Sequence, residues 1–379
     1  MNTHLLVIGA GPYALSTAAL ARERGIETVV LGHPMGFWRE NMPQGMFLRS
    51  GPDWHLDGAG IHTLEAYLEE RRIGADEVDP IPIGVFLDYA DWFRHTKGIE
   101  VRERFVTELV MRNGLFEATL ATGERIVADA VVAAPGIRHY KNVPLWTSQV
   151  PPGDVAHTCE LVRFDELAGG RVLIVGGRQS AYEWAALIRE HGAARIDIVH
   201  RHAIPRFERV SWKFIDAHVE RTLSVPGYWR KLPASEQEAI ARRFWEVGRL
   251  TLEQWLTARL ESDRIRRWPG TEVVEVRSDG DDDELRVVLS NSTQLAVDRV
   301  VLACGYRVDL SSVPYMAGVL DQVQLADGFP VLDVAFQTSL AGLYITGFSA
   351  TRDFGPFFGF VKGSPAAATL IVRDLLSRN

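Results

Sequence analysis

Two short glycine turns, far apart in the chain, carry the residues best suited to chemistry. The first lies in His4–Ala14, which reads HLLVIGAGPYA, and the second lies in Arg171–Ala181, which reads RVLIVGGRQSA. Each follows an apolar run and precedes an apolar pattern with helical spacing, so each predicts a strand, a tight turn and a helix. Backbone N–H groups at such a helix N-terminus bind the pyrophosphate of a dinucleotide. Two such turns predict two facing dinucleotides, usually a flavin and a nicotinamide.

The bulk composition is that of a folded protein with room for two domains. The chain has 379 residues, of which 46% are hydrophobic and 24% are charged. Its net charge of −8 argues against a nucleic-acid partner. No apolar run approaches the roughly 20 residues of a membrane span, and the first strand begins too early for a signal peptide. We therefore expect a cytoplasmic protein without a membrane partner.

The cysteine count limits the redox chemistry. Only Cys159 and Cys304 are present. They form neither a CxxC pair nor a zinc cluster, so we expect no metal site. A dithiol relay would require these two distant residues to meet, and two buried small side chains are the simpler interpretation.

The element after the first turn departs from the usual pattern at one position. Ala14, Ala18 and Ala21 give a small apolar helix face, and Thr28–Leu31 is the next strand. An acidic residue commonly ends this strand and binds the ribose hydroxyls. Gly32 stands there instead, which leaves His33, a later residue or water to bind the ribose.

An irregular aromatic segment follows, over residues 35–57. It contains Trp38, Arg39, Asn41 and Met46. Long irregular stretches inside a compact domain are typical of binding loops, although tryptophans also serve ordinary packing. Both interpretations stay open: a wall along a flavin ring, or core packing.

The second unit carries a cation where an acid would select NAD. Its second strand, 195–201, ends at Arg201, which suits the 2′-phosphate of NADP; a solvated surface arginine is the alternative. Residues from about 204 to 267 predict a tryptophan-rich helical insertion. Three roles for it stay open: core packing, a substrate pocket or a homodimer surface. The acidic run 281–284 predicts a solvated hairpin tip.

These patterns predict an α/β protein with two Rossmann-like dinucleotide-binding domains. The FAD-binding domain covers 1–150 and 297–379 and is discontinuous, because the strand at 342–347 and the last helix return to the first sheet. The NADP-binding domain covers 151–296 and includes the helical insertion.

Four segments give the chain a resemblance to two-dinucleotide-domain flavoproteins, and among them to the class B flavin monooxygenases. This group includes flavin-containing monooxygenases, amine N-hydroxylases and Baeyer–Villiger enzymes. The segments are Gly9–Pro12, Phe37–Asn41, Gln179–Ala181 and Ala303–Tyr306.

The motifs and the resemblance together imply two sets of cofactor-binding residues. Those expected at FAD are Gly9, Gly11, Pro12, Ala14, Trp38, Arg39, Asn41, Met46, Val106, Ala134, Gly136, Gly347, Phe348 and Phe357. Those expected at NADP(H) or beside it are Gly176, Gly177, Arg178, Gln179, Ser180, Arg201, Cys304, Gly305 and Tyr306.

Two departures from the family pattern affect the chemistry. Arg178 replaces the middle glycine of the second turn, where it either clamps a phosphate or crowds the pyrophosphate. The monooxygenase fingerprint survives only as Gly153, His157 and Thr158, which disfavours Baeyer–Villiger chemistry. His157 and Arg178 are the candidates for orienting the nicotinamide or stabilising a peroxide; the alternative is a linker or surface role.

The resemblance implies an FAD- and NADPH-dependent enzyme. We expect a monooxygenase that uses a flavin C4a-hydroperoxide and oxygen to oxygenate a small organic substrate, with N- or S-hydroxylation favoured. The alternatives are an NADPH-dependent flavoprotein reductase with a protein or quinone acceptor, and a non-catalytic FAD/NADP-binding sensor.

Overall fold

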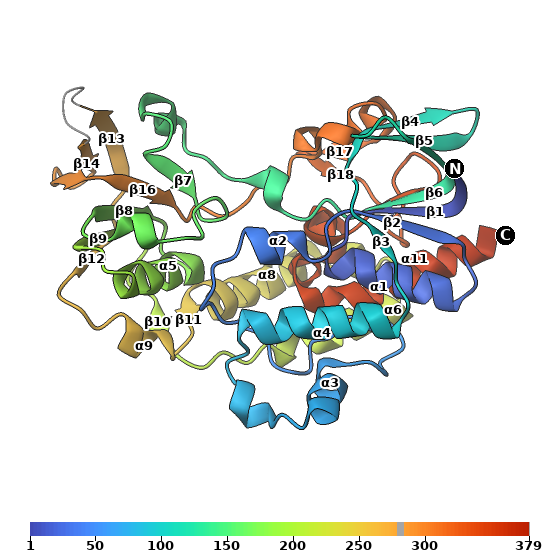
Figure 1. Ribbon diagram of the computed structural model, residues 1–379, viewed down its shortest axis with the longest axis horizontal. Coiled ribbons are helices and arrows are strands. Elements are labelled where there is room, and N and C mark those ends of the chain that lie inside the picture. Colours follow the sequence, from blue (N-terminus) through green and yellow to red (C-terminus); the bar gives the residue numbers. More distant parts are fainter. Residues whose placement is uncertain (279–283, 379) are drawn as a thin grey trace.

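The structure is a computed structural model that describes residues 1–278 and 284–378. Apart from Glu284, the acidic run expected to form a hairpin tip lies outside the described residues. Two parallel sheets lie side by side in the molecule, and both chain ends lie on the unit built around the first sheet (Figure 1).

The first sheet has a parallel core extended by an antiparallel meander. Strand order is β3-β2-β1-β6-β5-β4, and β19 pairs with β6. Continuous apolar runs in β1 (Leu5–Ile8) and β6 (Ala130–Ala133) are buried, which fits the centre of a parallel sheet. The strands are β1 (Asn2–Ile8), β2 (Thr28–Leu31), β3 (Val101–Arg102), β4 (Val106–Arg112), β5 (Leu115–Leu120), β6 (Arg125–Ala133) and β19 (Leu343–Ile345).

Helices from both ends of the chain cover this sheet. The first helix packs against the last one, which places residues far apart in sequence in one core. The helices of this unit are α1 (Pro12–Glu23), α2 (Gly36–Glu40), α3 (Leu64–Arg71), α4 (Ile83–Thr96), α10 (Thr351–Phe354) and α11 (Ser364–Arg378). The short hairpin of β17 (Leu325–Ala326) and β18 (Phe329–Pro330) lies nearby.

The second sheet is wholly parallel, with the order β12-β9-β8-β16-β7. Its strands are β7 (Val155–His157), β8 (Arg171–Val175), β9 (Arg195–His200), β12 (Ile265–Pro269) and β16 (Arg299–Leu302), and α5 (Gln179–Glu190) follows β8. An antiparallel sheet adds β13 (Val273–Ser278), β14 (Leu285–Leu289) and β15 (Gln294–Val297). Because β16 pairs with β7 and β8, the second sheet continues beyond residue 297, where we expected the first domain to resume.

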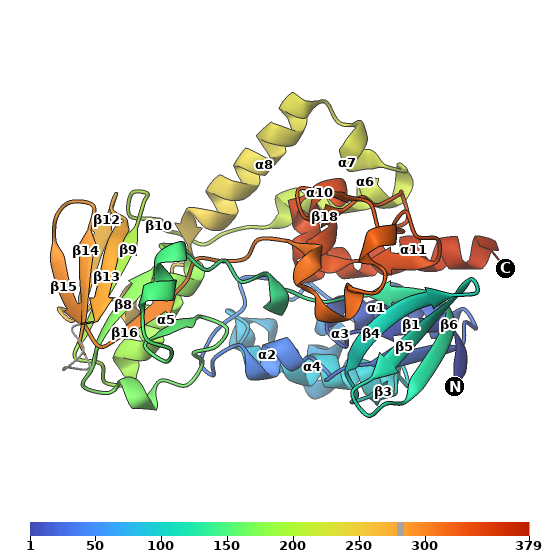
Figure 2. The same cartoon turned by 90° about the horizontal axis from the view of Figure 1, so that it is seen from above.

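The expected helical insertion forms, but its core is not that of the second unit. It leaves the second sheet after β9 and returns at β12, with α8 running from α7 back toward the second unit (Figure 2). Helix α6 packs on α11, and α7 packs on α10. Trp212 and Trp229 are buried in the hydrophobic core of the first unit. The elements are β10 (Arg206–Phe207), α6 (Asp216–Ser224), α7 (Tyr228–Lys231), α8 (Ala234–Arg249), β11 (Thr251–Leu252) and α9 (Leu256–Arg259).

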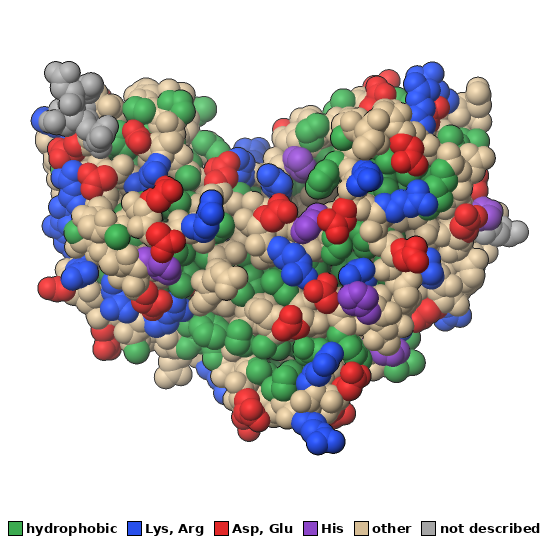
Figure 3. Space-filling model, in the orientation of Figure 1, with side chains coloured by type: hydrophobic (Ala, Val, Ile, Leu, Met, Phe, Trp, Pro, Cys, Tyr) green, Lys and Arg blue, Asp and Glu red, His purple; other side chains and the backbone are tan. Residues whose placement is uncertain are grey.

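The surface shows the division into two lobes as a hollow between them (Figure 3). Among the described residues, none of the helices has the length and hydropathy needed to cross a membrane.

Candidate cofactor sites

The first glycine turn brings the backbone of α1 to an open space at the carboxyl end of β1. Gly9 has a φ of +120°, and a Cβ added there would collide with the carbonyl oxygen of Ala134 at the end of β6. Gly11 is the N-cap of α1, with φ −85° and ψ −171°, and nothing lies within 4 Å of its missing Cβ. The turn therefore exposes the N-terminus of α1, where an anion is stabilised.

A cavity of about 490 Å³ opens at this turn, at the carboxyl ends of β1, β2 and β6. This is the edge at which parallel α/β sheets bind ligands. Eleven of the fourteen residues expected at FAD line it: Gly9, Gly11, Pro12, Ala14, Trp38, Asn41, Val106, Ala134, Gly136, Gly347 and Phe348.

Arg39, Met46 and Phe357 do not line the cavity. Arg39 pairs with Asp91 at 2.6 Å, which turns its side chain toward α4. The carbonyl of Met46 accepts a hydrogen bond of 3.2 Å from the Ile83 N–H. Phe357 is fully buried, with its ring stacked 5.7 Å from that of His218.

Three polar atoms of the cavity have no hydrogen-bond partner within the described protein. They are Asn41 Oδ1, the Tyr315 hydroxyl and Thr346 Oγ1, all of them buried. An unsatisfied buried polar group costs about 1–3 kcal/mol, so such groups are normally paired. Three in one cavity fit a ligand with several polar edges, such as a flavin dinucleotide.

Other lining residues were not identified from the sequence. Thr346 directly precedes Gly347 in the strand–glycine pattern of β19, and that position was its only signal. Tyr315 lies in an irregular stretch that gave no signal. His33, one of the residues considered for the ribose, also lines the cavity, and its Nδ1 lies 3.1 Å from Glu103 Oε2.

The loop at 358–360 is held over the first turn by a tyrosine. The Tyr13 hydroxyl donates to the carbonyl oxygens of Phe358 and Phe360, at 2.5 and 2.8 Å. Burial raises the pKa of Tyr13 well above its ordinary value, so the hydroxyl stays protonated. This contact fixes Phe360 as an aromatic wall of the cavity.

The second glycine turn repeats the geometry of the first. Gly176 has a φ of +135°, and an added Cβ would collide with the carbonyl oxygen of Ala303 at the end of β16. An added Cβ at Gly177 would overlap the ring of His200. Arg178 is the N-cap of α5 with φ −110° and ψ −172°, an extended backbone close to that of Gly11. The arginine is therefore accommodated without backbone strain.

The side chains at this turn combine positive charge with an unsatisfied amide. The Arg178 guanidinium lies 3.8 Å above the Trp245 ring, and burial, then the nearby Arg201, lowers its pKa. Gln179 Oε1 accepts from the Glu253 N–H at 3.2 Å, whereas its buried Nε2 has no partner among the described residues. Ser180 and Arg201 are exposed beside the turn.

Residues Cys304 to Tyr306 contact the segment of chain that connects the two units. Cys304 Sγ lies 3.4 Å from the Val175 carbonyl, and burial raises its pKa to about 11. The carbonyl of Gly305 lies 3.1 Å from His157 Nε2, and the Tyr306 ring packs edge-on against His157 at 5.0 Å.

His157 itself is occupied by these linker contacts. It is buried, and its Nδ1 lies 3.2 Å from Cys159 Sγ. Burial lowers its pKa, so the ring is neutral near pH 7. Both ring nitrogens of His157 therefore have protein partners, whereas the Arg178 guanidinium has no hydrogen-bond partner among the described residues.

A bridge from the first unit connects the two sites. Asn41 Nδ2, at the edge of the first cavity, donates to the Cys159 carbonyl at 2.8 Å. The Phe47 N–H donates to Glu183 Oε1 of α5 at 3.0 Å. These contacts tie the segment after α2 to the second unit and fix the two turns relative to each other.

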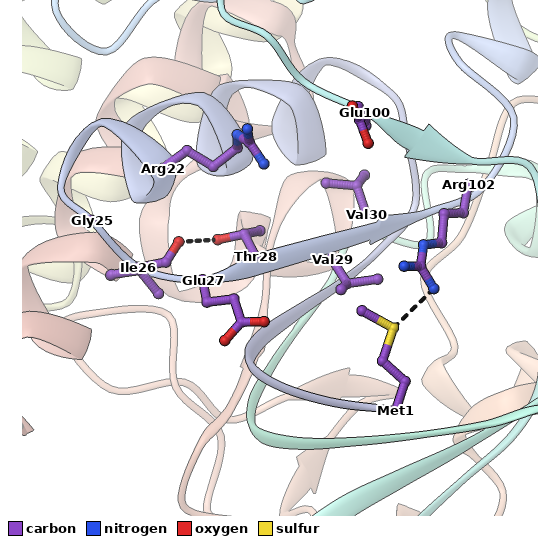
Figure 4. Close-up of a pocket in the computed structure, with 10 residues that line it drawn as sticks. All are labelled: Met1, Arg22, Gly25, Ile26, Glu27, Thr28, Val29, Val30, Glu100 and Arg102. Carbon is purple, nitrogen blue, oxygen red and sulfur yellow. Dashed lines mark hydrogen bonds between the residues drawn. The ribbon is translucent and has the colours of Figure 1, made fainter.

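A further cavity of about 420 Å³ lies at the opposite edge of the first sheet (Figure 4). It is formed by Met1, the start of β2 and Arg102. The hydroxyl of Thr28 donates within it to the Ile26 carbonyl at 2.9 Å. This position, at the amino end of β2, is remote from the glycine turns.

Comparisons with known proteins agree with this arrangement. The FAD-dependent urate hydroxylase of Xanthomonas campestris is 29% identical over 259 residues, which cover 64% of this chain and 53% of that protein. The chain thus spans about half the length of this relative. The probable indole-3-pyruvate monooxygenase YUCCA8 of Arabidopsis thaliana is 25% identical over an alignment of 401 positions, which covers 94% of this chain and 87% of that protein.

The solved structures support the same fold. The ornithine N-hydroxylase of Kutzneria sp. 744 superimposes with a TM-score of 0.82 over 100% of both chains, at 15% identity. At this identity the likeness concerns the fold alone, and it confirms the expected α/β class with two Rossmann-like units. The family model described as pyridine nucleotide-disulphide oxidoreductase matches residues 3–354. The chain therefore belongs to the pyridine nucleotide-disulphide oxidoreductase family.

Proposed function

We propose that the protein is an FAD- and NADPH-dependent monooxygenase that oxygenates a small organic substrate. The observation that carries the proposal is the first cavity, which opens at the N-terminus of α1 and whose lining residues carry three buried polar atoms without a partner among the described residues. The cavity suits FAD, because a dinucleotide offers both a diphosphate for the turn and polar edges for Asn41, Tyr315 and Thr346.

The second turn is proposed to bind NADPH. Gly176 would allow the diphosphate to approach α5 closely, as the first glycine of such turns does. Arg178 and Arg201 bear no carboxylate partner among the described residues and would meet phosphate groups. Arg201, which follows β9, stands where a cation favours the 2′-phosphate.

The domain division follows from the same assignment. We propose that FAD is bound by the unit of 1–150 together with the C-terminal part from β19 to α11, and NADPH by the unit of the second sheet. The division near 297 shifts to about residue 304, because β16 lies within the second sheet.

Bound FAD would supply hydride acceptance and oxygen activation, and the chain supplies the surroundings. Phe360 gives the cavity an apolar side, and Trp212 and Phe244 pack against Phe360 at 5.4 and 5.3 Å. Such a wall limits access of water and thereby protects reactive intermediates. Two named relatives, a urate hydroxylase and an indole-3-pyruvate monooxygenase, support oxygenation, whereas two relatives named ferredoxin–NADP reductase support the reductase alternative.

Reoxidation kinetics test the oxygenation step. The FAD-loaded protein, reduced anaerobically with NADPH, is mixed with oxygenated buffer while the flavin spectrum and hydrogen peroxide are followed. We expect a transient spectrum distinct from both reduced and oxidised flavin. Direct reoxidation without a transient would point to the reductase alternative. Failure of NADPH to reduce bound FAD would contradict both the monooxygenase and the reductase hypotheses.

A further inference from the structure

Three arginines near the two sites lack an acidic partner. They are Arg178 in the second turn, Arg201 after β9, and Arg249 at the end of α8. Among the described residues, no hydrogen bond or ion pair involves any of their side chains. A guanidinium carries five donors and remains charged, so this set is suited to anionic ligands.

Arg249 is the member of this set that approaches the first cavity. Its guanidinium lies 5.6 Å from the ring centre of Phe360, which lines that cavity. It is the last residue of α8, at the end of the helix that lies toward the second unit (Figure 2). Burial, and then the neighbouring Arg178 and Arg49, lower its pKa to about 10.

Glu253, an acidic group close in sequence, is already engaged by another arginine. Arg49 Nε lies 3.0 Å from Glu253 Oε1, and its Nη2 donates to the Thr251 carbonyl at 2.9 Å. Arg49 also donates to the carbonyl of Gly248, so it satisfies the C-terminal end of α8. Arg249 is thus not needed as a cap. A partly buried charge without a partner is costly, and a ligand anion would remove that cost.

The environment of Arg249 distinguishes a substrate from a cofactor phosphate. Arg178 and Arg201 lie at the second turn, where the nucleotide phosphates are proposed to bind. Arg249 lies beside an aromatic group at the first cavity: Phe360, which lines that cavity, packs with Trp212 at 5.4 Å, Phe244 at 5.3 Å and Trp54 at 6.2 Å. A ligand with an aromatic ring and a carboxylate would place its ring against these aromatic side chains and its carboxylate on the guanidinium.

We propose that Arg249 binds the carboxylate of an aromatic organic acid, whose ring packs against Phe360 at the flavin cavity. This inference rests on the proposed function and names the substrate class for it. Arg249 would act as a specificity residue: its planar fork holds the carboxylate through two parallel hydrogen bonds and fixes which part of the substrate faces the cofactor.

Matched acids and amides test the proposal. The FAD-loaded protein is titrated with benzoate, indole-3-acetate and phenylpyruvate, and separately with benzamide and indole-3-acetamide, by calorimetry and flavin absorbance. We expect at least one acid to bind, and its amide to bind at least about tenfold more weakly, since a charge-assisted hydrogen bond is lost. Binding of none of the acids, or equal binding of acid and amide, would overturn the proposal.

Variants assign the effect to the residue. Arg249→Gln should weaken binding of the acid by about tenfold or more and leave binding of the amide unchanged. Arg249→Lys should have an intermediate effect on acid binding. Arg243→Gln is the matched control, because Arg243 lies on the same helix and covers the Phe214 ring at 4.7 Å. In Arg243→Gln, acid binding and the rate of FAD reduction by NADPH should both stay at their wild-type values.

The outcomes distinguish failure of this inference from failure of the proposed monooxygenase function. Unchanged acid binding in Arg249→Gln would overturn the inference alone. A raised KM for NADPH in that variant, without loss of acid binding, would place Arg249 in the nucleotide site and would also overturn it. Failure of NADPH to reduce FAD in the wild-type protein would reject the proposed function, while calorimetry would still report acid binding.

Discussion

At the scale of single residues, Gly9 and Gly11 have different tasks in the same turn. Gly9 has a φ of +120° and packs against Ala134, whereas Gly11 has an ordinary φ of −85° and faces open space. Gly9 is therefore required for packing within the protein, whereas Gly11 leaves room for a ligand.

Substituting each glycine by alanine should separate these tasks. Gly11→Ala should change the free energy of unfolding of the FAD-free protein by less than about 1 kcal/mol, because a weaker N-cap and a less flexible unfolded chain offset each other. Its FAD affinity should nevertheless fall. Gly9→Ala should lower stability even without FAD. Chemical denaturation and FAD titration measure both quantities, and unchanged FAD affinity in Gly11→Ala would contradict the assignment of the turn.

Arg201 should set the choice between the two nicotinamide nucleotides. Replacing it by alanine removes a charge-assisted contact to the 2′-phosphate, worth about 1.5–3 kcal/mol. We expect KM for NADPH to rise by about tenfold or more and KM for NADH to stay constant. Steady-state FAD reduction with each nucleotide measures this, and a parallel loss with both would show that Arg201 does not contact the 2′-phosphate.

Residue roles were predictable from sequence where backbone geometry fixes the residue type. Gly9 and Gly176 follow from the strand–glycine pattern, since their positive φ favours glycine. Tyr315 and Thr346 were not identified, because an unpaired buried oxygen becomes visible only when its surroundings are known. Met46 and Arg39 were expected at the cavity from their sequence neighbourhood, but neither lines it, and the Arg39 side chain pairs with Asp91 instead.

At the scale of elements, the helical insertion joins the two units. Its helices were predictable from sequence, but their partner was not, since α6 and α7 leave the second sheet and pack on α11 and α10. Close approach at Gly248 is part of this packing: an added Cβ would overlap the Trp212 ring.

Paired glycine substitutions within helices measure that packing. Gly248→Ala should destabilise the protein by about 1–3 kcal/mol, because the new methyl group overfills the contact with Trp212. Gly84→Ala in α4 is the control, since nothing lies within 4 Å of its missing Cβ. That change should stabilise by up to about 1 kcal/mol through helix propensity. Thermal unfolding compares them, and a neutral Gly248→Ala would argue against tight packing of α8 on Trp212.

The contact between α5 and the segment after α2 should depend on pH. Burial raises the pKa of Glu183 to about 7, above its ordinary value of 4.5, although the Phe47 N–H and Arg259 oppose the shift. The folded state therefore holds this proton more tightly than the unfolded chain does. The stabilisation is complete below about pH 4.5 and is lost as the pH rises through about 7, on the order of 3 kcal/mol in total.

Urea unfolding at about pH 5 and about pH 8 tests this linkage. Glu183→Gln keeps a neutral side chain and should lose less stability over this range than the wild-type protein. Glu238→Gln, an exposed position on α8, is the control and should follow the wild-type profile. Identical profiles for wild type and Glu183→Gln would show that Glu183 does not titrate in the folded protein.

At the scale of the whole molecule, two similar turns face a shared region between two lobes. Gly9 against Ala134 and Gly176 against Ala303 are the same contact in two sheets. Asn41 and Glu183 link the units across the linker, which holds the two proposed nucleotide sites in one arrangement. The two-unit architecture was predictable because each motif is local. The bridging contacts depend on how the units dock, which no local pattern specifies.

The central claim is that these two sites serve one transfer of hydride from NADPH to FAD. Anaerobic stopped-flow mixing of the FAD-loaded protein with NADPH, followed by flavin absorbance, tests it most directly. We expect complete bleaching of the flavin, with NADPH effective at lower concentration than NADH. Bound FAD that neither nucleotide reduces would contradict the account.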